Sequence, residues 1–155
     1  MSIKLSSNTS LAIKICGLTI PSQAKYIATL GINAIGVIGV KSSSRYVSEQ
    51  KRSEIFNEVI SISSNIERVL VTADISEQEL SQSLNCCSPP SVIQLHGNES
   101  PEKCLSIKEK FPSIQLWKAF RVRDQKTIKQ IKLYEKKVDA LLLDAWHPSE
   151  LGGTG

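Results

Sequence analysis

Short apolar segments recur along the chain, separated by longer segments with helical periodicity. The apolar segments are LAIKIC (11–16), AIGVIGV (34–40), ERVLVTA (67–73), SVIQLH (91–96), IQLWKAF (114–120) and DALLLDA (139–145). Several are apolar at nearly every position, which is typical of strands that are covered on both faces. The intervening stretches have helical spacing and about the 10–15 residues expected of crossover helices.

Residues that favour helix starts precede the helical stretches. They are Pro21 with Ser22, Ser48 with Glu49, Ser76 with Glu77, Ser100 with Pro101, and Asp124. Strand–helix–strand repetition of this kind predicts an α/β fold with a parallel sheet of about six strands and five helices. Residues 1–10 are polar and are expected to form a flexible arm, which leaves one domain over residues 11–155.

Length and periodicity leave the form of the sheet open. The chain has 155 residues, whereas a closed eight-stranded βα barrel typically needs about 250. An open, doubly wound sheet of five or six strands therefore fits the length better. Only the motifs decide between the two forms.

Charge and composition narrow the range of functions. The net charge is +4 and aromatic residues make up 5%, so the chain has a mild basic excess and no stacking platform for a single-stranded nucleic acid. The lysines of the second half lie at helical spacings, as on a solvated helix face. No apolar stretch is long enough to span a bilayer, and the amino terminus does not resemble a secretory signal. We expect no nucleic-acid or membrane partner.

The four cysteines do not form a metal-binding pattern. The chain contains no CxxC motif and no histidine at zinc-type spacing from a cysteine. Reduced thiols in a cytoplasmic protein are therefore the expected state of Cys16, Cys86, Cys87 and Cys104.

Polar residues stand at or near the carboxyl ends of four predicted strands. Residues two apart share a face of a strand, so Lys14 lies beside Cys16 and Gln94 beside His96. Lys118 and Asp144 occupy corresponding places in the last two segments. Together they predict a site at the carboxyl ends of parallel strands.

Each of these residues also has a structural interpretation. A cysteine such as Cys16 is often a small buried apolar residue, His96 fits a loop position satisfied by backbone, and Asp144 fits a turn cap. A lysine is harder to place this way, because lysine is almost never fully buried without a partner.

A thiol and a carboxyl group suggest proton transfer. A free thiol has a pKa of about 8.5, which nearby cations lower, and Lys14 is a candidate for such a cation beside Cys16. A thiolate removes a proton from carbon next to an imine or carbonyl, and a carboxylic acid such as Asp144 gives one to a ring oxygen. An isomerase that moves hydrogen between adjacent sugar carbons needs both.

Five motifs in order identify a family resemblance. They are KICGLT (14–19), GVKSSSRYV (39–47), VIQLHGNESP (92–101), KAFRVRD (118–124) and DALLLDAWHPSELGGTG (139–155). The chain resembles the phosphoribosylanthranilate isomerases of tryptophan biosynthesis over nearly its whole length after residue 10. The resemblance implies a (β/α)8 barrel of TIM type without metal or organic cofactor. It also implies a small phosphorylated substrate and an Amadori rearrangement of an aminoaldose phosphate to a 1-amino-1-deoxyketose.

The resemblance also implies roles for individual residues. The motif cysteine falls on Cys16 as the general base at C2′, and the motif aspartate falls on Asp144 as the general acid that opens the furanose ring. The motif arginine falls on Arg45, which would hold the anthranilate carboxylate, as suits a guanidinium. His96 would line the site, and Gly152 and Gly153 would contribute to closing over the substrate. Lys14 is also expected beside the substrate, because it shares the face of its strand with Cys16.

The chain departs from the family pattern at two places. The loop before Arg45 lacks the usual proline, which loosens it. The sequence stops in the loop after the sixth strand, so we expect an incomplete barrel that lacks the phosphate-binding loops after strands seven and eight. We therefore expect the 155-residue chain to be inactive alone, and either to aggregate or to require a complementary C-terminal segment. Other enzymes of the tryptophan pathway are further candidate partners.

Two alternatives differ in class. One is another phosphosugar barrel, such as an indole-glycerol-phosphate synthase or a histidine-pathway isomerase, although the cysteine base argues against both. The other is a non-catalytic doubly wound binding module in which Cys16 is inert. CGLT contains a single glycine, which does not supply a phosphate-binding fingerprint.

Overall fold

Strands and helices alternate strictly in the computed structural model, which describes residues 11–145. The strands are β1 (Lys14–Cys16), β2 (Ala34–Ile38), β3 (Glu67–Thr72), β4 (Val92–Leu95), β5 (Gln115–Val122) and β6 (Ala140–Ala145). The helices are α1 (Pro21–Ala28), α2 (Glu49–Ile62), α3 (Glu77–Leu84), α4 (Pro101–Lys110) and α5 (Gln125–Ile131), the last followed by the 3-10 turn η1 (Lys132–Tyr134). The predicted arm, residues 1–10, lies outside the described residues.

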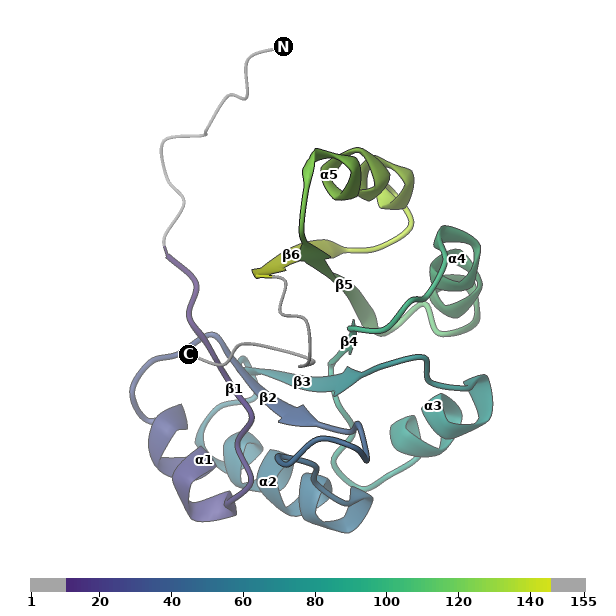
Figure 1. The fold of residues 1–155 in the computed structure, drawn as a ribbon. Coiled ribbons are helices and arrows are strands. Elements are labelled where there is room, and N and C mark those ends of the chain that lie inside the picture. The colour runs from purple at the N-terminus through teal and green to yellow at the C-terminus, as the bar shows by residue number, and fades with distance from the viewer. Residues whose placement is uncertain (1–10, 146–155) are drawn as a thin grey trace.

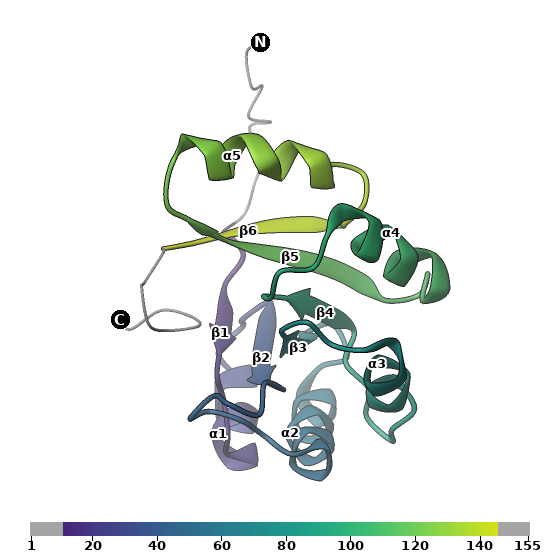
Figure 2. The same ribbon diagram turned by 45° about the vertical axis from the view of Figure 1, so that its right-hand side comes forward.

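All six strands form one parallel sheet in the order of the sequence. A doubly wound sheet would change direction at a switch point. This sheet does not, so the binding-module alternative with that fold is wrong. The sheet curves, and the helices lie along its outer, convex side (Figures 1 and 2). The arrangement is a half-barrel of the βα type, as the family motifs predicted.

Two apolar layers lie on the two faces of the sheet. On the convex face, Ile35, Leu70 and Ile93 pack with helix residues such as Phe56 and Ile107. On the concave face a smaller cluster contains Ala34, Ile38, Val69, Val71 and Val92. Because consecutive residues of a strand enter different layers, the strands read as continuous apolar runs.

Side-chain caps begin most of the helices as predicted. The oxygens of Ser48, Ser76, Ser100 and Asp124 each accept a hydrogen bond from a backbone N–H in the first turn of their helix. The first helix begins at Pro21 without a side-chain cap. Because each helix follows a strand in the chain, these caps also place the loops at the carboxyl edge of the sheet.

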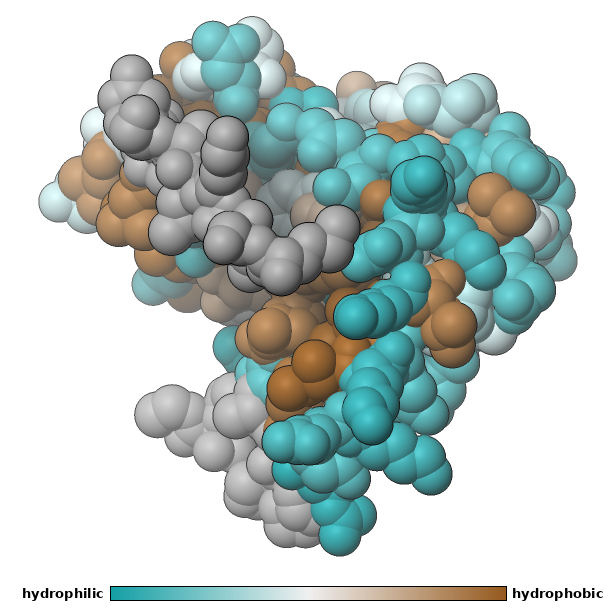
Figure 3. Space-filling view, turned by 90° about the horizontal axis from the view of Figure 1, so that it is seen from above, coloured by the Kyte–Doolittle hydropathy of each residue, from teal (hydrophilic) through white to brown (hydrophobic). Residues whose placement is uncertain are grey.

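Apolar side chains interrupt the polar surface on the side of α5, as Figure 3 shows. Ile128, Leu133, Leu141 and Leu143 are exposed there, and Leu11, Ile13 and Ile15 are exposed along the first strand. Within residues 11–145, β1 pairs only with β2 and β6 only with β5. None of the helices in this part of the chain has the length and apolar composition to cross a membrane.

Candidate active site

Lys14 and Cys16 lie together on the concave face of the sheet, above a glycine of the neighbouring strand. Cys16 is opposite Gly36 in the β1–β2 register. A Cβ atom built on Gly36 would lie 2.7 Å from the sulfur of Cys16 and 3.2 Å from Nζ of Lys14. The missing side chain at Gly36 therefore creates the space that brings thiol and ammonium together. The predicted shared face is confirmed.

The ammonium of Lys14 has a partner on the far side of the concave face. Its Nζ donates a hydrogen bond to Oε1 of Gln94 at 3.0 Å. Gln94 belongs to β4, so the bond passes over β2 and β3. Gln94 is buried and Lys14 is half-buried, so the pair is held inside the concave surface rather than in solvent.

Arg45 comes to the same place from the loop after β2. A Cβ atom built on Gly17 would lie 2.6 Å from a terminal nitrogen of Arg45. Gly17 has φ +86°, the left-handed region that favours glycine, and directly follows Cys16. The two properties of Gly17, its backbone shape and its lack of a side chain, let the guanidinium lie next to the strand end that carries the thiol.

His96 and Asp144 meet at the ends of β4 and β6. His96 Nε2 lies 3.4 Å from Oδ2 of Asp144, without hydrogen-bond alignment, and Nε2 is buried. Arg121 lies opposite Asp144 in the β5–β6 register. Burial lowers the pKa of His96 below its usual value of 6.5, although the Asp144 carboxylate opposes this shift. The imidazole is therefore neutral at pH 7.

Lys118 does not belong with the other polar strand-end residues, so the prediction that it joins them is wrong. It lies opposite Leu95, on the face that packs against the helices. It is 2% exposed, forms an ion pair with Glu99 at 3.1 Å, and donates to the carbonyls of Gly97 and Ala119. Lys118 is thus a buried structural cation behind the site.

The structure also adds residues that the sequence did not single out. Gly36 shapes the surroundings of Cys16, and Arg121 adds a cation near Asp144. Gln94, placed beside His96 by the sequence, gains a contact with Lys14 that the sequence did not predict. Spacing alone gave no signal for Gly36, because its importance depends on Cys16, the residue opposite it in β1. Gly152 and Gly153, predicted to contact substrate, lie outside the described residues.

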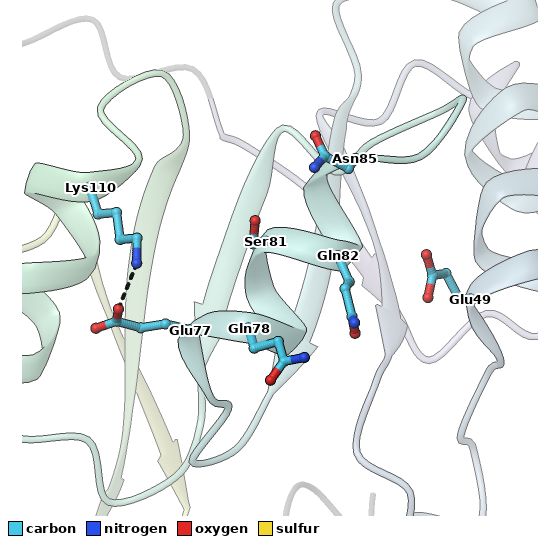
Figure 4. Close-up of a pocket in the computed structure, with 7 residues that line it drawn as sticks. All are labelled: Glu49, Glu77, Gln78, Ser81, Gln82, Asn85 and Lys110. Atoms are coloured by element: carbon cyan, nitrogen blue, oxygen red, sulfur yellow. Dashed lines mark hydrogen bonds and ion pairs between the residues drawn. The ribbon is translucent and has the colours of Figure 1, made fainter.

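The groove on the outer face of α3 lacks such a convergence of reactive groups. It has a volume of about 800 Å³ and is lined by polar side chains that include Glu49, Gln82 and Lys110 (Figure 4). Its charged pair, Lys110 with Glu77, is an ion pair at 2.8 Å on the surface. Among residues 11–145, no three His, Cys, Asp or Glu side chains gather as metal ligands would.

The concave strand ends therefore combine three kinds of group. They offer a thiol with a nearby ammonium, a guanidinium suited to a carboxylate, and a carboxyl beside a neutral imidazole. Such a set has the chemistry to bind an anionic molecule and to move protons on it.

Comparison with known proteins agrees with this geometry. A family model described as N-(5'-phosphoribosyl)anthranilate (PRA) isomerase matches residues 13–155. The chain is 44% identical over 147 residues to the N-(5'-phosphoribosyl)anthranilate isomerase of Thermosynechococcus vestitus. It is 43% identical over 145 residues to that of Rippkaea orientalis. The matched regions cover 94% of this chain in both cases, but only 61% and 66% of the two relatives.

Solved structures give the same answer for the fold. The phosphoribosylanthranilate isomerase of Thermotoga maritima superposes with a TM-score of 0.81 at 26% identity, covering 94% of this chain and 66% of that one. A phosphoribosylanthranilate isomerase in complex with reduced 1-(o-carboxyphenylamino)-1-deoxyribulose 5-phosphate gives 0.77 at 25% identity, covering 88% and 66%. With the family model spanning nearly all of the described residues, the chain belongs to the N-(5'-phosphoribosyl)anthranilate isomerase family.

Proposed function

We propose that the protein isomerises N-(5'-phosphoribosyl)anthranilate to 1-(2-carboxyphenylamino)-1-deoxyribulose 5-phosphate in tryptophan biosynthesis. The observation that carries the proposal is that Cys16, Arg45 and Asp144 stand at the carboxyl edge of one curved sheet in a chain of this family. The reaction needs no metal or organic cofactor. The unpaired thiols of the chain support a reducing, cytoplasmic compartment.

Two proton transfers make up the proposed chemistry. The carboxylic acid of Asp144 gives a proton to the ring oxygen as the bond from C1′ to that oxygen breaks, which leaves an iminium at C1′. The thiolate of Cys16 then removes the proton from C2′, and the electron pair of that bond forms an enolamine. The enolamine becomes the ketose when C1′ gains a proton and the hydroxyl at C2′ loses one.

The electrostatics of the site support an anionic substrate. Arg45 presents a guanidinium, which matches the planar carboxylate of an anthranilate ring with two parallel hydrogen bonds. Lys14 and Arg121 add positive charge on the same concave side. The neutral imidazole of His96 lies against the carboxyl group of Asp144 and adds no positive charge to the site.

Ligand binding tests the proposal without requiring turnover. We expect the chain to bind reduced 1-(o-carboxyphenylamino)-1-deoxyribulose 5-phosphate in calorimetry, and Arg45→Met to weaken binding by about ten-fold, because a charged hydrogen-bonded pair is lost. Lys51→Met removes one positive charge from the surface of α2 and serves as the matched control. Together with a complementary C-terminal segment that supplies turnover, Cys16→Ala should keep binding but abolish conversion of substrate and growth of a tryptophan auxotroph. No binding, or equal binding by Arg45→Met, would contradict the proposal.

A further inference from the structure

The hydrogen bond between Lys14 and Gln94 is unusual in its reach. Adjacent strands lie about 4.8 Å apart, so the three spacings from β1 to β4 would separate the strands by about 14 Å on a flat sheet. Curvature shortens this path, and Gly36 leaves it open in β2. A long, flexible lysine side chain would otherwise extend to solvent. Here it is fixed inside the concave face at 3.0 Å from an amide oxygen.

We propose that Gln94 is a positioning residue that holds the Lys14 ammonium over Gly36, where it stabilises the thiolate of Cys16. The inference rests on the proposed role of Cys16 as the base. It assigns functions to Gln94 and Gly36 that follow from their contacts. Gln94 acts through Lys14, and Gly36 acts by leaving room for both side chains.

The amide of Gln94 carries no charge, and this neutrality is central to its proposed role beside Lys14. A carboxylate in place of the Gln94 amide would also hold the ammonium, but its negative charge would cancel the field of Lys14 at the thiol. The amide oxygen fixes the position and leaves the positive charge uncompensated. A cation within about 4–6 Å favours the charged form of an acid, so the uncompensated ammonium favours thiolate.

Other charged or titratable groups on the concave side must be separated from Lys14. Arg45 lies over Gly17, next to Cys16 in the chain, and is a second cation. His96 and Asp144 face the concave side from β4 and β6. In the proposed complex the substrate carboxylate neutralises Arg45, which leaves Lys14 as the cation that supports the thiolate during proton removal.

The pH dependence of Cys16 alkylation tests this inference. Cys86→Ser and Cys87→Ser remove two thiols, while Cys104 is buried with a pKa raised by burial to about 11, so it reacts little near neutral pH. In this background we expect the midpoint for reaction with iodoacetamide to rise by about 0.5–1 pH unit in Lys14→Met, which means roughly 3–10 times less thiolate at pH 7.

The Gln94 variants distinguish charge from simple packing. Gln94→Glu keeps an acceptor for Lys14 yet should raise the midpoint at least as much as Lys14→Met. Gln94→Met frees the lysine and should raise the midpoint less.

Lys14→Arg keeps the charge and should restore most of the wild-type value, whereas the surface variant Lys51→Met should not change it. Gly36→Ala should displace the Cys16 sulfur and the end of the Lys14 side chain, and raise the midpoint in a folded chain.

These outcomes are independent of turnover. If Lys14→Met and Gln94→Glu leave the alkylation midpoint unchanged while circular dichroism shows them folded, the inference is overturned. The isomerase function would then still be decided by ligand binding. Conversely, a shifted midpoint in a chain that fails to bind the product analogue would support the Lys14–Gln94 inference and reject the isomerase.

Discussion

Burial and a neighbouring carboxylate act on the imidazole of His96 in opposite directions. Burial is the larger effect and lowers the pKa of His96 from its usual 6.5, while Asp144 raises it and Arg121 and Lys118 lower it further. The unfolded chain therefore binds this proton more readily than the folded chain does. By linkage, stability is full above the unfolded pKa and is lost as the pH falls toward the folded pKa.

The free energy of unfolding should consequently decrease as the pH drops below about 6.5. His96→Gln should make stability less dependent on pH in this range, as measured by urea unfolding at about pH 7.5 and 5.5. Glu77 and Asp139 have pKa values lowered from 4.5 and 3.8, so they titrate below this range. The control is His147→Gln, which changes the other histidine of the chain. Equal pH slopes in wild type and His96→Gln would contradict the prediction.

Individual residues show how far sequence reasoning reaches. The shared face of Lys14 and Cys16 follows from a period of two, and the structure confirms it. The same period could not assign Lys118, because both faces of these strands are apolar and the pattern does not reveal which face is concave. Only the pairing of Lys118 with Leu95 on the helix side settles its direction. The roles of Cys16, Asp144 and Arg45 remain predictions.

A buried ion pair connects the β4–α4 loop to β5. Glu99 is 5% exposed and Lys118 2%. The carboxylate of Glu99 also accepts hydrogen bonds from the backbone N–H groups of Asp74 and Gly97. The hydroxyl of Tyr134 donates to the backbone carbonyl of Glu99. One side chain thus links the loop after β3, the loop after β4 and β5. These contacts fix the strand end from which His96 projects.

Glu99→Gln should lower the free energy of unfolding by about 3 kcal/mol, because it leaves the Lys118 ammonium buried without its counter-charge. Chemical denaturation measures the change. The double variant Glu99→Gln/Lys118→Met should recover part of the loss, since no uncompensated charge remains. Glu102→Gln, an exposed change on α4, is the control and should have no measurable effect. A Glu99→Gln chain as stable as the control would refute the structural role.

Strand ends were harder to predict than strand order. β1 begins at Lys14 rather than Leu11, and β5 continues to Val122 rather than ending at Phe120. The apolar pattern of one strand gives no information about the length of the strand that pairs with it. The end of β5 pairs Arg121 and Val122 with the last residues of β6, so a polar residue enters the ladder. Helix starts were more predictable because a cap such as Ser100 acts within one turn.

The half-barrel has a stable centre and less constrained sides. Strands β2 to β4 pair on both edges, and their side chains are almost fully buried. In the described residues β1 and β6 each pair on one edge, and Leu143 is 67% exposed. Local opening therefore exposes less apolar surface at the sides than at the centre.

Hydrogen exchange should follow this gradient. We expect the amides of β2, β3 and β4 to exchange slowest and those of β1 and β6 fastest, as measured by mass spectrometry of peptic peptides. The comparison between β1 and β3 within one sample is internally controlled. Equal protection of these two strands would show that the sides are as constrained as the centre.

The bond from Lys14 to Gln94 also bears on the order in which the molecule folds. It joins residues 80 positions apart, so forming it requires closure of a long loop. The capped helix starts, by contrast, depend on residues three apart. Contacts of such large sequence separation slow folding and are gained after local structure. The setting of Cys16 is therefore a late product of folding: a chain with every helix formed but the first four strands not yet in register would have the thiol without its cation.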